Sequence, residues 1–260
     1  MLVMRTLKLT LAYDGTRYAG WQRQGARERR PTIQATLEDV LSKILRERVI
    51  VLGSGRTDAG VHAEAQVAHA RVRSSMPLAR LHRALNATLP PDITATRLEE
   101  AAPTFHAQRH VRVKRYRYRI VLGEVVLPFE RRYVQHVRGR VDVSRMRQEA
   151  RAVKGVHDFK AFCRAESAAR QVSTRRTISD VVVRRRGPRI TIELEGNGFL
   201  HGMVRSIVGT LLQVGQGKRP LGTVARLLRT KDRRQVGFTA PARGLCLVEV
   251  QYDGQAHRGG

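Results

Sequence analysis

A glycine-punctuated stretch in the first half of the chain, Gly53–Gly60, carries an arginine and an aspartate two residues apart, Arg56 and Asp58. Glycines allow a backbone to turn tightly and to approach a ligand closely, so this stretch is predicted to be a loop. In a loop, the spacing permits an ion pair that keeps Asp58 ionised, and an ionised aspartate can act as a nucleophile or a general base. The alternative is an ordinary turn in which the carboxylate accepts backbone hydrogen bonds, and spacing alone favours this alternative.

Other kinds of catalytic site have weaker support in the sequence. The loop lacks the Gly-Lys-Ser/Thr ending of a P-loop, and the chain has no Gly-x-Ser-x-Gly nucleophile elbow. Glycoside hydrolysis needs a second carboxylate, and the closest acidic residue in sequence is Glu64. His62 and His69 lack partners at metal-ligand spacing, so no metal site is predicted and His62 is expected to make a structural hydrogen bond.

A basic and aromatic stretch follows at Arg109–Arg119. Its positive side chains alternate with two tyrosines: Arg109, Arg112, Lys114, Arg115, Tyr116, Arg117, Tyr118 and Arg119. Basic side chains hold phosphates and aromatic rings stack on unpaired bases, which favours an RNA-binding surface. A solvated sheet face with tyrosines in the core explains the same pattern equally well.

The composition indicates a polyanionic partner. Lys and Arg number 49 against 22 Asp and Glu, for a formal net charge of +27, and nucleic acid is the obvious polyanion. A general arginine bias of the source proteome is the alternative.

No apolar run of about 18 residues is present, so no membrane span is predicted. The N-terminus offers no signal peptide and the two cysteines form no disulfide framework, so a cytoplasmic location is expected.

Hydrophobic periodicity predicts a mixture of strands and helices. The expected strands are Thr6–Ala12, Val49–Leu52, Ala65–Val72, Ile93–Leu98, Tyr116–Leu122, Ile178–Arg185, Arg189–Glu195 and Leu245–Tyr252. The expected helices are Thr32–Arg48, Leu78–Thr88, Val143–Lys154, Phe199–Val214 and Leu221–Leu228. The order shows no strict strand–helix–strand rhythm, which favours an α+β fold over a doubly wound parallel sheet.

Each half of the chain repeats the pattern of a strand, a helix and a strand pair. We therefore expect two related domains, residues 1–105 and 106–260, each a mixed or antiparallel sheet with helices on one face, and a cleft between them. The second strong helix, Phe199–Val214, is apolar enough to be core, and Arg205 interrupts it near its start. Such an arginine faces solvent or pairs with a carboxylate, and the sharper hypothesis makes Asp58 that carboxylate.

The stretch Gly55–Ala63, which reads Gly-Arg-Thr-Asp-Ala-Gly-Val-His-Ala, closely resembles the signature of the TruA family of tRNA pseudouridine synthases. Further blocks resemble the family in the same order: Tyr13–Gln24, Thr32–Gln34 with Leu37 and Glu38, Leu89–Ile93, Phe105–Ala107, Lys114–Tyr118, Gly155–Phe159, Asn197–Arg205 and Ala240–Leu245. The similarity extends over nearly the whole chain.

The resemblance implies an enzyme that converts uridines at positions 38 to 40 of the tRNA anticodon stem-loop to pseudouridine. It implies a homodimer that uses neither a metal nor an organic cofactor. Asp58 corresponds to the catalytic aspartate of the family and Arg56 to its neighbouring arginine. Tyr116 corresponds to the tyrosine that stacks on the target base, and Arg205 to the arginine that pairs with the aspartate.

The chain departs from the family at Gln108, where an arginine is common. Arg109 is expected to take over a contact with RNA there, alongside Lys114 and Arg115. Three alternatives remain open: a non-catalytic RNA-binding protein on the same scaffold, a relative that modifies other uridines, and a nucleoside glycosidase.

If the positive charge binds RNA, the affinity for tRNA should fall steeply with salt, because each phosphate contact releases counterions. The expected slope of log affinity against log salt is about −0.7 to −0.9 per phosphate contact. Filter binding of an unmodified tRNA transcript over a salt series measures this slope, and a flat response would show that the charge does not bind RNA.

Overall fold

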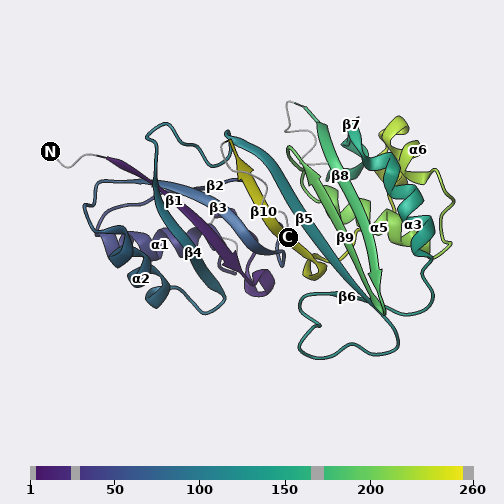
Figure 1. Ribbon diagram of the computed structural model, residues 1–260, viewed down its shortest axis with the longest axis horizontal. Coiled ribbons are helices and arrows are strands. Elements are labelled where there is room, and N and C mark those ends of the chain that lie inside the picture. Colours follow the sequence, from purple (N-terminus) through teal and green to yellow (C-terminus); the bar gives the residue numbers. More distant parts are fainter. Residues whose placement is uncertain (1–3, 25–29, 165–172, 254–260) are drawn as a thin grey trace. The chain divides into compact units, whose positions relative to one another are not determined.

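The computed structural model describes residues 4–24, 30–164 and 173–253. The chain forms two compact units (Figure 1). The first unit comprises Met1–Arg112 with Leu247–Gly260, and the second comprises Val113–Cys246.

The sheet of the first unit has the strand order β4-β1-β3-β10, with β2 on β3. The strands are β1 (Arg5–Tyr13), β2 (Val51–Gly53), β3 (His62–Val72), β4 (Ile93–Ala101) and β10 (Leu245–Tyr252). β1 pairs antiparallel with both β3 and β4. Its alternating residues Leu7, Leu9 and Leu11 are fully buried, as their spacing of two predicts.

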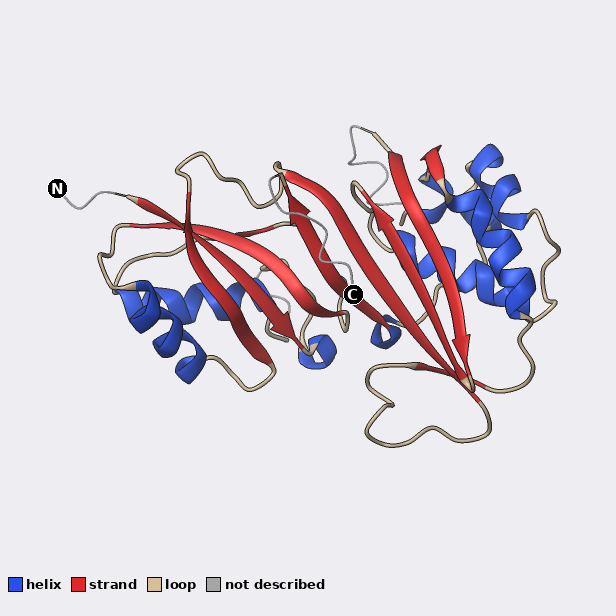
Figure 2. Ribbon diagram, in the orientation of Figure 1, coloured by secondary structure: helices blue, strands red, loops and turns tan. Residues whose placement is uncertain are grey.

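Two helices, α1 (Ile33–Leu45) and α2 (Leu78–Thr88), contact each other beside this sheet (Figure 2). The side chain of Thr32 accepts a hydrogen bond from the backbone of Ala35 and so caps α1. Ile33, Leu37 and Leu41 of α1 are fully buried, which accounts for their helical spacing.

The sheet of the second unit has the order β5-β9-β8-β7, with β6 parallel to β5. The strands are β5 (Val111–Leu122), β6 (Gln135–Val137), β7 (Gly155–Asp158), β8 (Arg175–Arg186) and β9 (Arg189–Gly196). The helices are α3 (Val143–Ala150), α5 (Met203–Gly215) and α6 (Thr223–Thr230). α5 contacts both α3 and α6, and nearly all of its residues are buried, so it is the core helix of this unit.

The two faces of β5 differ in character. Tyr118 is fully buried, and its hydroxyl lies 2.8 Å from the side-chain oxygen of Gln135 and 2.8 Å from the carbonyl oxygen of Pro241. On the other face, Arg117 donates to Glu193 at 2.7 Å. The aromatic residues of β5 therefore belong to the core, and the basic ones lie on the opposite face.

The α+β prediction is confirmed, and every expected strand and helix is present. α5 begins at Met203 rather than at Phe199, because Gly202 has a left-handed conformation with φ of 73° and separates the preceding residues from the helix. Two strands that the sequence did not reveal, β6 and β7, have three and four residues and are too short to show alternation.

The compact units divide the chain differently from the expected ranges 1–105 and 106–260. Leu247–Gly260 groups with the first unit, in which β10 hydrogen-bonds to β3. Those two ranges as separate domains stay a prediction.

Candidate functional site

The loop that carries Asp58 joins β2 to β3 and is anchored to β3 at its start. The backbone of Ser54 donates to Val67 at 2.7 Å, and the hydroxyl of Ser54 donates to the side chain of Gln66 at 2.6 Å. The amide nitrogen of Gln66 in turn donates to the carbonyl oxygen of Gly55 at 2.9 Å. Ser54 and Gln66 are both fully buried, so the loop leaves β2 along a fixed path.

The centre of the loop is held by the segment that follows β1. The hydroxyl of Tyr13 lies 2.9 Å from that of Thr57, and the backbone of Trp21 donates to the carbonyl of Thr57 at 3.1 Å. Thr57 is buried, whereas Asp58 is half-buried and Arg56 is exposed. The loop therefore uses Thr57 as its anchor and leaves the side chains on either side of it accessible.

Two glycines allow this close approach. Gly20 has φ of +100°, and a Cβ atom there would lie 2.5 Å from the carbonyl oxygen of Thr57. A Cβ atom at Gly53 would lie 2.5 Å from the indole ring of Trp21, which is itself buried. A side chain at position 20 would displace the loop, and a side chain at position 53 would displace the indole of Trp21.

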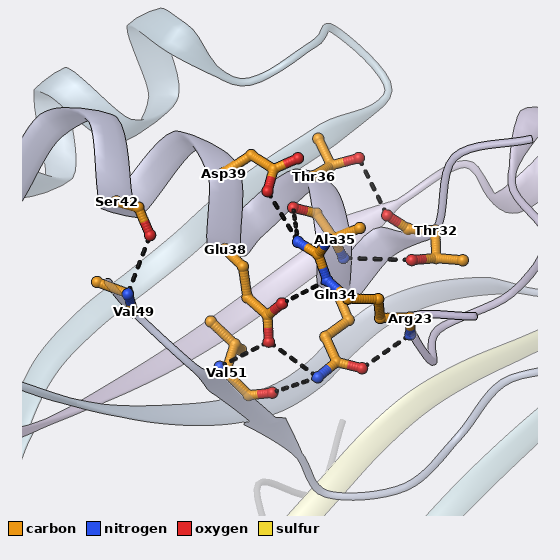
Figure 3. Close-up of polar contacts among 10 residues, drawn as sticks. All are labelled: Arg23, Thr32, Gln34, Ala35, Thr36, Glu38, Asp39, Ser42, Val49 and Val51. Atoms are coloured by element: carbon orange, nitrogen blue, oxygen red, sulfur yellow. Dashed lines mark hydrogen bonds and ion pairs between the residues drawn. The ribbon is translucent and has the colours of Figure 1, made fainter. Parts of the chain in front are cut away.

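A polar network fixes the strand that leads into the loop (Figure 3). Gln34 of α1 donates to the carbonyl of Val51 at 3.0 Å, and the backbone of Val51 donates to Glu38 at 3.1 Å. The side chain of Arg23 donates to Glu38 at 2.8 Å, and its backbone donates to Gln34 at 2.9 Å. Gln34 and Glu38 are buried, so α1, β2 and the segment after Trp21 are fastened together around two buried polar groups.

His62 has the structural role that the sequence predicts. Its Nδ1 atom accepts a hydrogen bond from the backbone of Gly15 at 3.2 Å and lies 3.1 Å from the carboxylate of Asp14. The ring is buried and closes the loop at the start of β3.

In the second unit, Tyr116 lies on the core face of β5. Its ring contacts Phe199 at a centroid distance of 5.0 Å and an angle of 81°. Arg115, on the opposite face, forms an ion pair with Glu195 at 2.8 Å. A contact of Arg115 with RNA stays a prediction, and the ion pair shows that its guanidinium already has a structural partner.

Arg205 lies in the first turn of α5. Its Nε atom donates to the carbonyl of Ala240 at 2.7 Å, and the backbone of Ala240 donates to the carbonyl of Arg205 at 3.0 Å. The arginine is half-buried and fixes the segment that precedes β10. Its pairing with Asp58, which belongs to the other unit, stays a prediction.

Gln108 and Arg109 are exposed, and their backbone N–H groups donate to the Nδ1 atom of His106 at 3.2 Å and 3.3 Å. The neighbouring Ala107 donates to Nδ1 of His69 at 3.2 Å. Burial lowers the pKa of His69, with His106 as a second cause, so this ring is neutral and able to accept that bond. Three backbone hydrogen bonds to two histidine rings hold this turn, which presents the side chains at positions 108 and 109 to solvent.

Sequence reasoning gave no role to the supports of the site, namely Gln34, Glu38, Ser54 and Gln66, nor to Phe199. Gln34, Glu38 and Phe199 lie in segments that resemble the family. Gln34 and Glu38 also lie close to the apolar positions of a predicted helix, where a polar residue needs a buried partner. Among the described residues, no group of three His, Cys, Asp or Glu side chains is placed to hold a metal ion. Over the same ranges, no helix is both long and apolar enough to cross a membrane.

The model of one protein family, described as tRNA pseudouridine synthase, matches residues 10–108 and 150–253 of the chain. The tRNA pseudouridine synthase A 2 of Clostridium perfringens is 42% identical over 249 residues, which cover 96% of this chain and 100% of that protein. The tRNA pseudouridine synthase A of Limosilactobacillus fermentum is 43% identical over 259 residues, with 98% of each chain covered. That of Pelobacter propionicus is 44% identical over 249 residues, with 96% of this chain and 100% of that protein covered.

A match of this extent places the chain in a class of RNA-modifying isomerases. The chain belongs to the tRNA pseudouridine synthase family.

The contact between Gly20 and Thr57 yields a prediction about the loop. Gly20→Ala introduces a methyl group against the carbonyl of Thr57 in a backbone conformation that costs an alanine about 1–2 kcal/mol. We expect a lower melting temperature and, because the loop must shift, a loss of isomerase activity at temperatures where the protein is still folded.

Gly139→Ala is the matched control, since Gly139 has φ of +81° but nothing within 4 Å of its Cβ position. It should lose similar stability and keep its activity. Equal activity losses in the two variants would contradict a specific role of Gly20 in placing the loop.

Proposed function

We propose that this chain isomerises uridine to pseudouridine in tRNA, with Asp58 as its catalytic carboxylate. The observation that carries the proposal is the identity of over 40% to tRNA pseudouridine synthases A along nearly the full length of both chains. The anchored loop supports it, because a catalytic group must be held in a fixed geometry and yet be reachable. Thr57 supplies the fixed point, and Asp58 next to it is half-buried.

The reaction is an isomerisation, so it needs neither a redox partner nor an energy source. The bond from N1 to C1′ of the nucleotide breaks, the uracil turns, C5 bonds to C1′, and the C5 proton leaves while N1 gains one. One ionised carboxylate serves each of three routes: attack at C1′, attack at C6, or removal of the 2′ proton. Each route requires the base to leave its stack, which costs a few kcal/mol.

We propose that two residues of the second unit, Tyr116 and Arg205, assist the reaction. Tyr116 stacks on the flipped base, and a base–aromatic stack is worth about 1–3 kcal/mol, enough to offset much of the flipping cost. Its edge-on contact with Phe199 supports this role, because the tyrosine ring is already held in place. Arg205 pairs with Asp58, orients it and keeps it charged, and Arg56 of the Asp58 loop is the third member of the catalytic group. We further propose that the uridines lie at positions 38 to 40 of the anticodon stem-loop and that the enzyme works in the cytoplasm, where tRNA is found.

We also propose that the enzyme is a homodimer and that residues 123–134, between β5 and β6, contribute to its interface. This segment exposes large apolar side chains: Val125 (80% exposed), Leu127 (57%), Phe129 (85%) and Tyr133 (39%). An adjoining hollow of about 360 Å³ is lined by Val125, Val126 and Val134 together with Arg131, Arg138 and Arg243. Exposed apolar side chains beside such a hollow suit a second copy of the chain, which offers the same pair of features.

Phe129→Asp should weaken the dimer by about 2 kcal/mol or more, because a central aromatic anchor is replaced by a charge. Sedimentation equilibrium at micromolar concentration measures the change in mass. Ile50→Asp, which alters an exposed apolar residue outside the segment, should leave the dimer intact. A wild-type protein that sediments as a monomer, or a Phe129→Asp variant that dimerises normally, would contradict the proposal.

Asp58→Asn keeps the size of the side chain and removes its charge, so isomerisation should fall by at least about 10³-fold while tRNA affinity stays near that of the wild type. Release of tritium from tRNA labelled at uracil C5 measures the reaction, and filter binding measures affinity. Glu64→Gln, which changes the nearest acidic side chain in sequence, should be active.

Parallel loss of binding and activity in Asp58→Asn would point to a structural aspartate. Binding without any tritium release by the wild type would favour the alternative, a non-catalytic tRNA-binding protein on the same scaffold. Free uracil among the products would identify a glycosidase instead.

A further inference from the structure

Three positive side chains lie around Tyr116 in the second unit: Lys114, for which a contact with RNA is already expected, and Arg164 and Arg176, which have no role so far. They surround the segment Asn197–Gly202, which connects β9 to α5 and carries Phe199. Asn197 and Thr177 of β8 exchange two hydrogen bonds of 3.1 Å, backbone to carbonyl and backbone to side chain. The segment is therefore tied to β8 at its start and packed on Tyr116 at its centre.

Arg176 lies against this segment from the side of β8. The Cβ position of Gly198 is 3.5 Å from the Nε atom of Arg176, so the guanidinium lies next to a residue without a side chain. One Nη atom donates to the carbonyls of Ser173 at 2.9 Å and Arg175 at 2.6 Å. These bonds hold the guanidinium in place, and partial burial lowers the pKa of Arg176.

Arg164 lies at the other end of the segment. Its backbone donates to the carbonyl of His201 at 3.1 Å, and its Cγ atom is 3.5 Å from the Cβ position of Gly202. The arginine is exposed. Arg176 and Arg164 thus lie beside Gly198 and Gly202 of the same short segment. Any other residue type at these two positions would place a side chain against the arginine.

Lys114 completes the group. It precedes Tyr116 by two residues on β5, so the two side chains leave the strand on the same face. Burial, with the charge of Arg176 as the second cause, lowers the pKa of Lys114 to about 8. The charge of Arg176 contributes to this shift, and an anion bound beside the two side chains would oppose it.

Carboxylates on the neighbouring strands have other contacts. Glu195 of β9 binds Arg115 at 2.8 Å and Ser179 at 2.9 Å on the face opposite to Lys114. Asp158 of β7 binds Lys231 at 2.9 Å. Each of these two carboxylates therefore has a positive partner outside the group.

We propose that Lys114, Arg176 and Arg164 form a subsite for backbone phosphates of the RNA strand that flank the nucleotide stacked on Tyr116. The inference rests on the proposed function, since it takes Tyr116 as the residue that holds the target base. Guanidinium groups bind phosphate oxygens in pairs, and a lysine adds a compact point charge. A nucleotide turned out of its stack is held at the base by Tyr116, and clamping the phosphates beside it fixes the sugar, where the glycosidic bond must break.

The test uses Lys114→Gln and Arg176→Gln in the full-length enzyme with an unmodified tRNA transcript labelled at uracil C5. Each variant should bind tRNA about tenfold more weakly and show a salt slope smaller by about 1, because one phosphate contact is lost. Arg186→Gln is the matched control, since Arg186 is exposed at the opposite end of β8. It should keep the wild-type slope.

The pH profile provides a second readout that a purely structural role would not change. Lys114 is charged below its pKa of about 8 and loses its charge as the pH rises through that value, so wild-type affinity should decline between about pH 7 and 9. Lys114→Arg stays charged throughout and should bind with a flatter profile over the same range.

Wild-type salt slopes in both Gln variants, or identical pH profiles for the wild type and Lys114→Arg, would overturn the subsite. This outcome differs from a failure of the proposed function. In that case the wild type itself would release no tritium, whereas a failed subsite leaves wild-type isomerisation intact.

Discussion

The site depends on one close contact between two backbones, that of the segment after β1 and that of the loop carrying Asp58. The carbonyl of Thr57 accepts a hydrogen bond from Trp21, and Gly20 lies so close to it that a methyl group does not fit. Gly20, Gly53 and Thr57 therefore hold a glycine-rich loop in one place. The buried side chains of Gln34 and Glu38 hydrogen-bond to β2, which precedes this loop. The loop that carries Asp58 is therefore fixed both at its start and at its centre.

Much of this arrangement could be predicted from local patterns. Alternation located β1 and β5, helical spacing located α1 and α5, and the glycines marked the Asp58 loop. Three features could not be predicted, because they depend on contacts distant in sequence. The polar pair in α1 is stabilised by β2 and by Arg23, Arg115 is neutralised by Glu195 of another strand, and α5 starts late because Gly202 takes a left-handed conformation. The pairing of Arg205 with Asp58 stays a prediction.

The positive side chains of the second unit lie in two different surroundings. On one face of β5, arginines are matched by Glu193 and Glu195 and hold the sheet together. Around the segment Asn197–Gly202, positive side chains gather beside a ring that is already fixed. Net charge alone does not distinguish these two surroundings. The alternation of β5 does so, because successive residues face either the glutamates of β9 or the aromatic core.

The grouping of β10 with the first unit has a consequence for biosynthesis. β3 and β10 are hydrogen-bonded neighbours, yet the whole second unit lies between them in the chain. On the ribosome, the first unit emerges early but must wait with an unpaired strand edge until the last strand is made. Such long-range pairing is slow, and the edge of β3 stays open to wrong partners until β10 has been made.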